Sequence, residues 1–246
     1  MNNPYKKNHE IISTYLNMLT DDLNHGLIVL SKGGLGKTTL ILDSMKSKQL
    51  IQDIHYIYAN SFSTPLAFYK LLDSVNALQS PKILILDDME LLLSDKHILG
   101  MLRAALWEAG GKRVVNYHST TQKKTSTDFT GKIIMLINDL PKDNKVLNAL
   151  CDRVFFHEIK LSNNEILELI QQNIVQKPYK TLNLRQRVKI AEAIKERTTE
   201  NTNLSFRTLI KAYQFYIYAP SSWLNMLDAS MNITSQKQIN TPSGLF

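Results

Sequence analysis

The feature that most constrains this sequence is an apolar run that leads into a glycine-rich turn and then into a helical pattern. Residues 27–30 are apolar throughout, as in a strand buried on both faces of a parallel sheet. Residues 31–36, called the glycine turn below, contain three glycines, and a helix is expected from Lys37. A strand, a tight turn and a helix in direct succession predict an α/β fold with a parallel sheet.

The glycine turn and the two residues after it nearly match the phosphate-binding pattern G-x-x-x-x-G-K-[ST], with Ser31 at its first position. Glycines allow backbone N–H groups to turn inward around phosphate oxygens, the lysine reaches the β- and γ-phosphates, and the hydroxyl binds Mg²⁺. We therefore expect ATP and Mg²⁺ as cofactors; the alternative is a glycine-rich turn without a ligand. The expected nucleotide-binding residues are Ser31, Lys32, Gly33, Gly34, Leu35, Gly36, Lys37, Thr38 and Thr39.

A second apolar run, residues 83–86, ends in two carboxylates. We expect this strand to lie directly beside strand 27–30. Asp87 would then meet Mg²⁺ together with Thr38, and Asp88 would orient or deprotonate an attacking water. The alternative is a strand that ends in a solvated acidic turn, with a carboxylate that caps the next helix.

Strands and helices alternate up to about residue 160, and only helices follow. Further strands are expected at 55–58, 113–118, 132–137 and 154–159, and helices at 8–23, 63–77, 99–109, 162–176, 183–198 and 203–218. The helix at 99–109 is expected to end at Gly110 and Gly111. The pattern predicts an α/β domain over 1–160, a helical lid over 161–220, and a short helix with a flexible tail over 221–246.

Composition bears on partners and compartment. Lys and Arg exceed Asp and Glu by 29 to 22, a net charge of +7, which favours polyanions such as nucleic acid. The single cysteine, Cys151, cannot form a disulfide within the chain, as expected in the cytoplasm, or in the host cytoplasm for a viral protein. No apolar run has membrane-spanning length, so no membrane partner is expected.

In these motifs and their order the chain resembles the AAA+ P-loop ATPases, in particular the DNA-associated type found in viral superfamily 3 helicases and helicase loaders. Strand 133–137 ends in Asn138, which resembles the sensor 1 residue that positions water or contacts the γ-phosphate. Arg153 resembles the arginine finger, which acts on the ATP of a neighbouring subunit, and Arg207 resembles sensor 2. The resemblance implies the catalytic residues Lys37, Asp88, Asn138, Arg153 and Arg207, and the metal ligands Thr38 and Asp87. The family usually has Glu where Asp88 stands.

Residues 113–132 resemble the pre-sensor 1 hairpin of those helicases, which tracks the nucleic-acid backbone. His118, Lys123 and Lys124 are the candidate DNA contacts, because backbone tracking requires charge and little base readout. The alternative is a solvated loop between two strands.

The resemblance implies an ATP-dependent homo-oligomer, ring or helical, that acts on single-stranded DNA as a helicase, a helicase loader or another replication or recombination factor. A replication protein is a further candidate partner, through the peptide 244–246. One alternative is a protein-remodelling motor with a pore loop at 58–62. Another is a nucleotide-gated binding switch with little turnover, because Lys32 and the glycines also resemble the loop of ParA/MinD-type partition ATPases.

Overall fold

The structure is a computed structural model that describes residues 4–60, 64–89, 93–117, 125–139 and 145–239. The chain divides into two compact units, which are described separately. The first comprises residues 1–32 and 36–159, and the second comprises residues 33–35 and 160–246. The glycine turn therefore contributes to both units.

Within the described residues, five parallel strands form the central sheet of the first unit, in the order β2-β3-β6-β1-β7. These strands are Tyr56–Ala59 (β2), Ile83–Asp87 (β3), Lys132–Ile137 (β6), Gly26–Ser31 (β1) and Phe155–Ile159 (β7). Every position of β3 and β6 is buried, as the apolar runs 83–86 and 133–137 predict for strands covered on both faces. The expected α/β class with a parallel sheet is confirmed.

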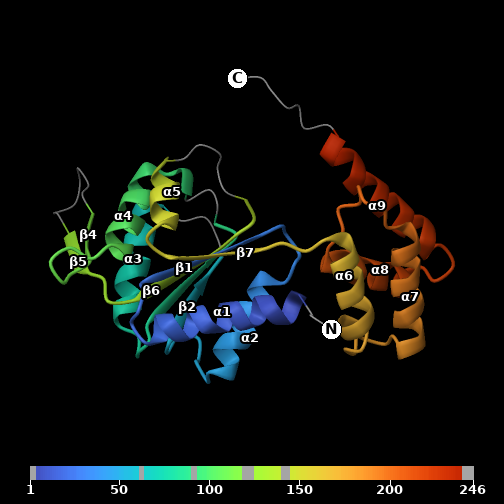
Figure 1. The fold of residues 1–246 in the computed structure, drawn as a ribbon, viewed down its shortest axis with the longest axis horizontal. Helices are drawn as coiled ribbons and strands as arrows, with labels where there is room; N and C mark the ends of the chain where they lie inside the picture. Colours follow the sequence, from blue (N-terminus) through green and yellow to red (C-terminus); the bar gives the residue numbers. More distant parts are fainter. Residues whose placement is uncertain (1–3, 61–63, 90–92, 118–124, 140–144, 240–246) are drawn as a thin grey trace. The chain divides into compact units, whose positions relative to one another are not determined.

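Helices cover both faces of this sheet (Figure 1). One face carries α1 (Pro4–Thr20) and α2 (Lys37–Ser47), and the other carries α3 (Pro65–Asn76), α4 (Lys96–Leu106) and α5 (Lys145–Cys151). On the latter face Phe68 and Leu102 pack with Ile28, Leu84 and Met135, which come from three neighbouring strands. Of the described helices, none combines the length and apolar character needed to cross a bilayer.

The strand order differs from the expectation. The strand at 83–86 was expected directly beside strand 27–30, and this is wrong: β6 lies between them, with Leu27 aligned to Ile134 and Leu84 aligned to Ile133. Apolar composition does not distinguish these strands, because all three are buried on both faces. The carboxyl ends of parallel strands nevertheless share one edge of the sheet, so the residues after β1, β6 and β3 remain close.

Helix α4 ends at Leu106, earlier than expected. Gly110 and Gly111 do not cap it. Both have positive φ (62° and 76°), and they form a tight turn across which the backbones of Ala109 and Lys112 pair. The two glycines thus lead the chain from α4 into the next strand.

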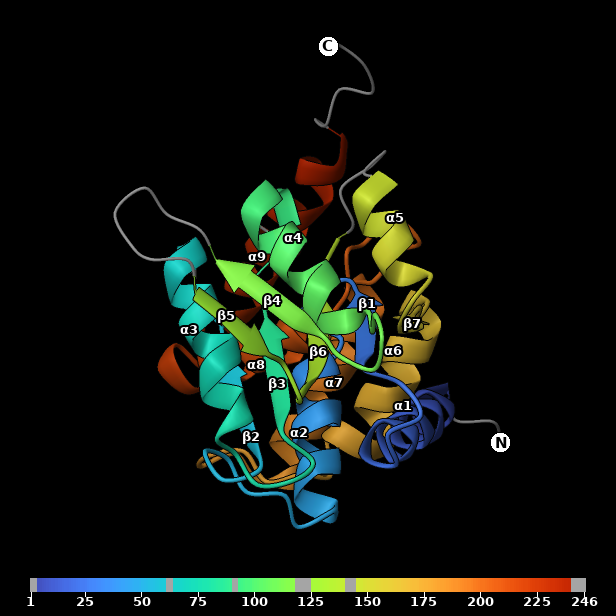
Figure 2. The ribbon, with the colours of Figure 1, turned by 90° about the vertical axis from the view of Figure 1, so that its left-hand side faces the viewer.

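Strands β4 (Val114–Tyr117) and β5 (Thr125–Asp128) form a separate antiparallel pair beside α3 and α4 (Figure 2). They lie within the segment that resembles a pre-sensor 1 hairpin. The candidate DNA contacts His118, Lys123 and Lys124, which fall between the two strands, lie outside the described residues.

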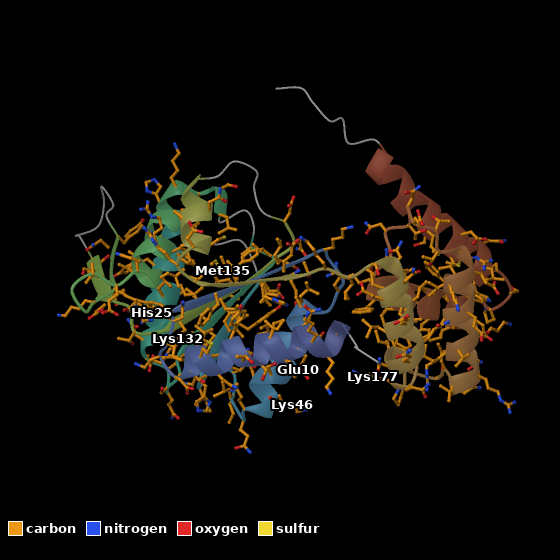
Figure 3. The ribbon with its side chains drawn as sticks, in the orientation of Figure 1. Glu10, His25, Lys46, Lys132, Met135 and Lys177 are labelled. Carbon is orange, nitrogen blue, oxygen red and sulfur yellow. The ribbon has the colours of Figure 1, made fainter. Side chains whose placement is uncertain are left out.

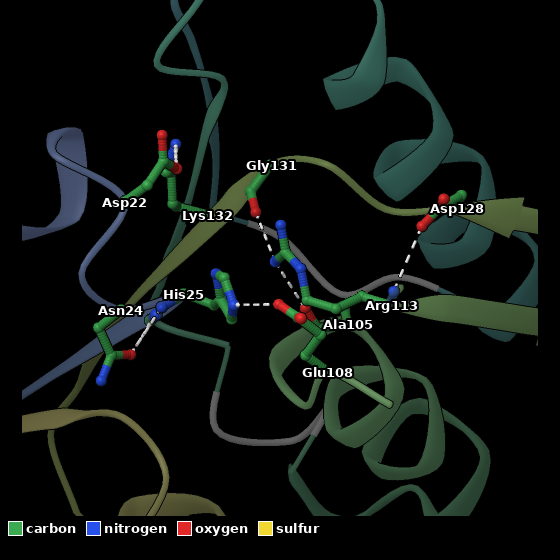
Figure 4. A network of polar contacts seen from close by, with 10 residues as sticks. Asp22, Asn24, His25, Ala105, Glu108, Arg113, Asp128, Gly131 and Lys132 are labelled. Atoms are coloured by element: carbon green, nitrogen blue, oxygen red, sulfur yellow. Dashed lines mark hydrogen bonds and ion pairs between the residues drawn. The ribbon is translucent and has the colours of Figure 1, made fainter. Parts of the chain in front are cut away.

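Arg113 anchors the base of this hairpin (Figure 4). Its side chain is buried, and one guanidinium nitrogen donates to the carbonyl oxygens of Ala105 and Gly131 at 2.9 and 2.7 Å. The guanidinium also lies over the ring of Phe129, 5.3 Å from its centroid. Burial lowers the pKa of Arg113, and neighbouring carboxylates, Glu108 first among them, oppose this shift.

Further polar contacts surround this anchor at the amino-terminal edge of the sheet (Figures 3 and 4). The buried Lys132 pairs with Asp22 at 2.6 Å, and His25 Nε2 lies 3.4 Å from a carboxylate oxygen of Glu108. Burial and then the charge of Arg113 lower the pKa of His25, while Glu108 acts in the opposite direction. This edge is opposite to the one at which β1, β3 and β6 end.

The second unit is helical where it is described. It contains α6 (Asn163–Leu169), a π-helical turn (Ile170–Ile174), α7 (Leu184–Arg197), α8 (Phe206–Tyr218) and α9 (Trp223–Ile239). The short helix expected within 221–246 extends to Ile239, and the sequence contains no glycine or proline between Trp223 and Pro242 to interrupt it. Leu35 of the glycine turn is buried in the core of this unit.

Candidate functional site

The carboxyl-terminal edge of the sheet brings together side chains from three parts of the chain. Helix α2 supplies Lys37 and Thr38 directly after β1, Asp87 is the last residue of β3, and Asn138 follows β6. Lys37 and Asp87 are buried, at 5% and 3% exposure. These two residues are buried and carry opposite charges, and each belongs to its own chain of hydrogen bonds.

The first chain converges on the carboxylate of Asp87. Its Oδ2 accepts hydrogen bonds from the Thr38 hydroxyl at 2.6 Å and from the Tyr58 hydroxyl at 2.7 Å. Its Oδ1 is buried and has no hydrogen-bond donor within the described part of the chain. A buried carboxylate oxygen without a donor is costly, and a cation is one of the groups that satisfies it.

The second chain runs from Lys37 through Asn138 to Asp88. The Lys37 ammonium donates to Oδ1 of Asn138, and the Asn138 amide donates to Oδ1 of Asp88 at 2.8 Å. Asp88 is exposed and has a φ of 51°, and its backbone N–H donates to the carbonyl of Leu136 in β6. Its carboxylate is therefore held at the edge of the sheet while it faces solvent.

The glycine turn adopts the backbone that its sequence requires. Gly34 and Gly36 have φ values of 83° and 81°, in the left-handed region that glycine occupies without strain. Gly36 is also the N-cap of α2. Because glycine has no side chain, this residue supplies no side-chain acceptor for the first backbone N–H groups of the helix. Such a helix start favours an anion.

The other residues expected at the nucleotide differ in their surroundings. Ser31 is buried, and its hydroxyl donates to the carbonyl of Lys32. The side chains of Lys32 and Thr39 are exposed. Ser31 therefore stabilises the start of the turn, while Lys32 and Thr39 are accessible.

The middle of the turn, residues 33–35, packs within the second unit. The Gly34 carbonyl accepts from the backbone N–H of Phe206, and a Cβ at Gly34 would lie only 3.0 Å from Ser205 and 3.1 Å from Arg207. Arg207 is exposed and lines a pocket of about 160 Å³ together with Gly33. Arg207 thus lies beside Gly34 within the second unit, and its expected role at the phosphates stays a prediction.

Arg153 is not brought to the same edge as Lys37. It precedes β7, whose Phe155 aligns with Leu27 at the start of β1. With about 3.3 Å per residue, the length of β1 separates Arg153 from the glycine turn by roughly 13 Å or more. The guanidinium lies over the exposed ring of Trp107, 4.6 Å from its centroid.

The residues present fit a Mg²⁺ ion. Within the described residues there is no group of three or more His, Cys, Asp or Glu side chains suited to a metal. Thr38 and Oδ1 of Asp87, which has no donor among the described residues, would be the protein ligands, directly or through water. Mg²⁺ suits such a site, because it keeps several waters and commonly takes one carboxylate with substrate phosphates.

Sequence analysis missed Tyr58 as a residue of this site. Burial, followed by its contact with Asp87, raises the pKa of Tyr58, so the hydroxyl stays protonated and donates. Only the strand order reveals its role, because β2 lies beside β3. The sole signal in the sequence was its position near the end of an expected strand.

Comparison of this chain with family models and with curated proteins finds no match.

Proposed function

We propose that this chain is a Mg²⁺-dependent ATPase of the AAA+ type that acts on single-stranded DNA as a homo-oligomer. The observation that carries the proposal is the carboxylate of Asp87. One of its oxygens is bound by Thr38, the other is buried without a donor in the described residues, and the buried Lys37 precedes Thr38 in the chain. This arrangement has the charges required for a nucleoside triphosphate and its metal ion.

Each residue of the site has a defined task under this proposal. Lys37 and the backbone N–H groups at the start of α2 bind the β- and γ-phosphates. Thr38 and Asp87 hold Mg²⁺, which neutralises charge on the phosphate oxygens when bound. Arg207, beside Gly34, adds positive charge.

Asp88 and Asn138 act on the water. The exposed carboxylate of Asp88 accepts the proton of the attacking water, and Asn138 fixes the orientation of that carboxylate through the 2.8 Å hydrogen bond. Asn138 also accepts a hydrogen bond from Lys37, so it links the phosphate-binding lysine to Asp88. Because Asp88 is one methylene shorter than Glu, we expect slow hydrolysis.

The position of Arg153 is compatible with the proposed homo-oligomer. Arg153 lies at the opposite edge of the sheet from Lys37, so an arginine that stabilises transition-state charge would come from a second copy. The net charge of +7 and the hairpin of β4 and β5 favour nucleic acid as the track.

A nucleotide-gated binding switch is the second candidate, because Asn138 already engages one oxygen of the short Asp88 side chain. The protein-remodelling alternative has less support. Its expected pore loop, residues 58–62, includes Tyr58, whose hydroxyl is bound to Asp87, and residues 61 and 62, which lie outside the described residues.

An ATP hydrolysis assay separates these functions. The rate is measured for the protein without additions, with single-stranded DNA, and with an unfolded polypeptide. We expect DNA to stimulate turnover. The double variant Lys123→Ala/Lys124→Ala should lower the salt dependence of DNA binding by roughly 1.4 in log–log slope, for two lost phosphate contacts. The matched control, Lys46→Ala/Lys70→Ala, removes two exposed lysines elsewhere.

Stimulation by unfolded polypeptide instead of DNA would favour the remodelling motor. Tight ATP binding with no turnover under any condition would favour the switch. Equal salt slopes for the hairpin variant and its control would remove the hairpin from the DNA site.

A further inference from the structure

The two oxygens of the Asp87 carboxylate have different surroundings. Oδ2 accepts two hydrogen bonds, from Thr38 at 2.6 Å and from Tyr58 at 2.7 Å. Oδ1 accepts none from the described residues, although it is buried. A carboxylate that is free to rotate would not keep this asymmetry, so the two hydroxyl groups define which oxygen is left for a ligand.

The strand register explains why Tyr58 reaches this carboxylate. Tyr58 of β2 aligns with Ile85 of β3, and Asp87 follows Ile85 by two residues. Because side chains alternate along a strand, Asp87 and Tyr58 project from the same face of the sheet as diagonal neighbours. Diagonal neighbours are separated by about 7–8 Å, a distance that a tyrosine side chain spans.

Tyr58 differs from Thr38 because Thr38 is an expected ligand of the cation and Tyr58 is not. The Thr38 hydroxyl is itself an expected ligand of the ion and has to serve the ion as well as Asp87. Tyr58 donates from the neighbouring strand and has no such second task. It is therefore the group that keeps Oδ2 occupied when an ion is bound.

We propose that Tyr58 determines the cation preference of the site, by holding Oδ2 of Asp87 so that only Oδ1 is offered to the ion. This inference rests on the proposed function. A carboxylate restricted to one oxygen suits Mg²⁺ and Mn²⁺, which take octahedral geometry with single oxygens. Ca²⁺, which accommodates bidentate carboxylates at longer distances, gains least from this arrangement. Tyr58 is a positioning residue, because it acts through Asp87.

The test is Mn²⁺ binding in the presence of a non-hydrolysable ATP analogue, followed by electron paramagnetic resonance, for the wild type and Tyr58→Phe. Removal of a partner that orients a metal ligand should weaken Mn²⁺ binding about tenfold. In competition, the excess of Ca²⁺ over Mg²⁺ needed to displace Mn²⁺ should shrink in Tyr58→Phe. This ratio compares two ions on the same folded molecules, so it is independent of the folded fraction.

Two controls isolate the mechanism. Tyr56→Phe removes a hydroxyl two residues earlier on the same face of β2, and should leave both readouts unchanged. In an Asp87→Asn background, Tyr58→Phe should have no further effect on the ion preference, because the carboxylate through which it acts is gone.

Mn²⁺ affinity within twofold of wild type, with an unchanged preference for Mg²⁺ over Ca²⁺, would overturn this inference while leaving the proposed function intact. A wild-type protein that binds neither the analogue nor Mn²⁺ would overturn both.

Discussion

Replacement of Arg113 by methionine tests how the hairpin of β4 and β5 is held on the sheet. Arg113 is 8% exposed, and its guanidinium donates to the carbonyl oxygens of Ala105, near the end of α4, and Gly131, directly before β6. Methionine retains much of the apolar volume but donates no hydrogen bond. Arg113→Met therefore leaves two carbonyl groups without that donor.

The magnitude follows from these contacts. A hydrogen bond from a charged donor contributes about 1.5–3 kcal/mol, so two of them sum to about 3–6 kcal/mol. Methionine also avoids the cost of burying a charged group, a cost that lowers the pKa of Arg113, and this offsets part of the loss. We expect a net decrease of about 3 kcal/mol in the free energy of unfolding of the first unit, or about 1.5 M in urea midpoint at a slope of about 2 kcal/mol/M.

The assay is urea denaturation followed by tryptophan emission in a Trp223→Phe background. The two tryptophans lie one in each unit, so Trp107 then reports on the first unit alone. Arg103→Met, which removes an exposed arginine from the last turn of α4, is the control and should shift the free energy by less than about 0.5 kcal/mol. Equal midpoints for Arg113→Met and Arg103→Met would refute the anchoring role of Arg113.

Two further predictions concern catalysis and pH. Arg153→Ala should lower the turnover number for ATP hydrolysis by about 10³-fold and leave ATP binding unchanged, because Arg153 lies away from Lys37. Binding is measured by titration with a fluorescent ATP analogue. Loss of binding in this titration would contradict a role of Arg153 at the ATP of a second copy. Because burial lowers the pKa of His25 from 6.5, the unfolded state takes up the proton first, and the free energy of unfolding should fall as the pH drops below about 6.5. His25→Gln should flatten that decline between pH 7.5 and 5.5, and an unchanged slope in chemical denaturation would exclude His25 as its source.

The sequence predicted the parts of this protein that depend on local pattern. Unbroken apolar runs specified β1, β3 and β6, because strands covered on both faces tolerate few polar residues. The positive φ of Gly34 and Gly36 follows from the spacing of glycines in the turn. Asp87 and Asn138 were recognised because each comes directly after an apolar run, residues 83–86 and 133–137.

The parts that were missed depend on which strands are neighbours. Strand order is a long-range property, and β6 could not be placed between β1 and β3 from equally apolar sequences. Tyr58 became recognisable only once β2 was seen beside β3. Arg113 likewise shows no local signal, since its partners are backbone carbonyls 8 and 18 residues away.

The central claim, that the glycine turn and Lys37 bind a nucleoside triphosphate, is tested most directly by calorimetric titration of a non-hydrolysable ATP analogue with Mg²⁺. Lys37→Ala is compared with Lys46→Ala, which removes an exposed lysine from the last turn of the same helix (Figure 3). We predict binding that Lys37→Ala weakens by about 10- to 100-fold, as expected for a lost charged hydrogen bond, and that Lys46→Ala leaves unchanged. Equal affinity in the two variants, or no binding to the wild type, would contradict the account.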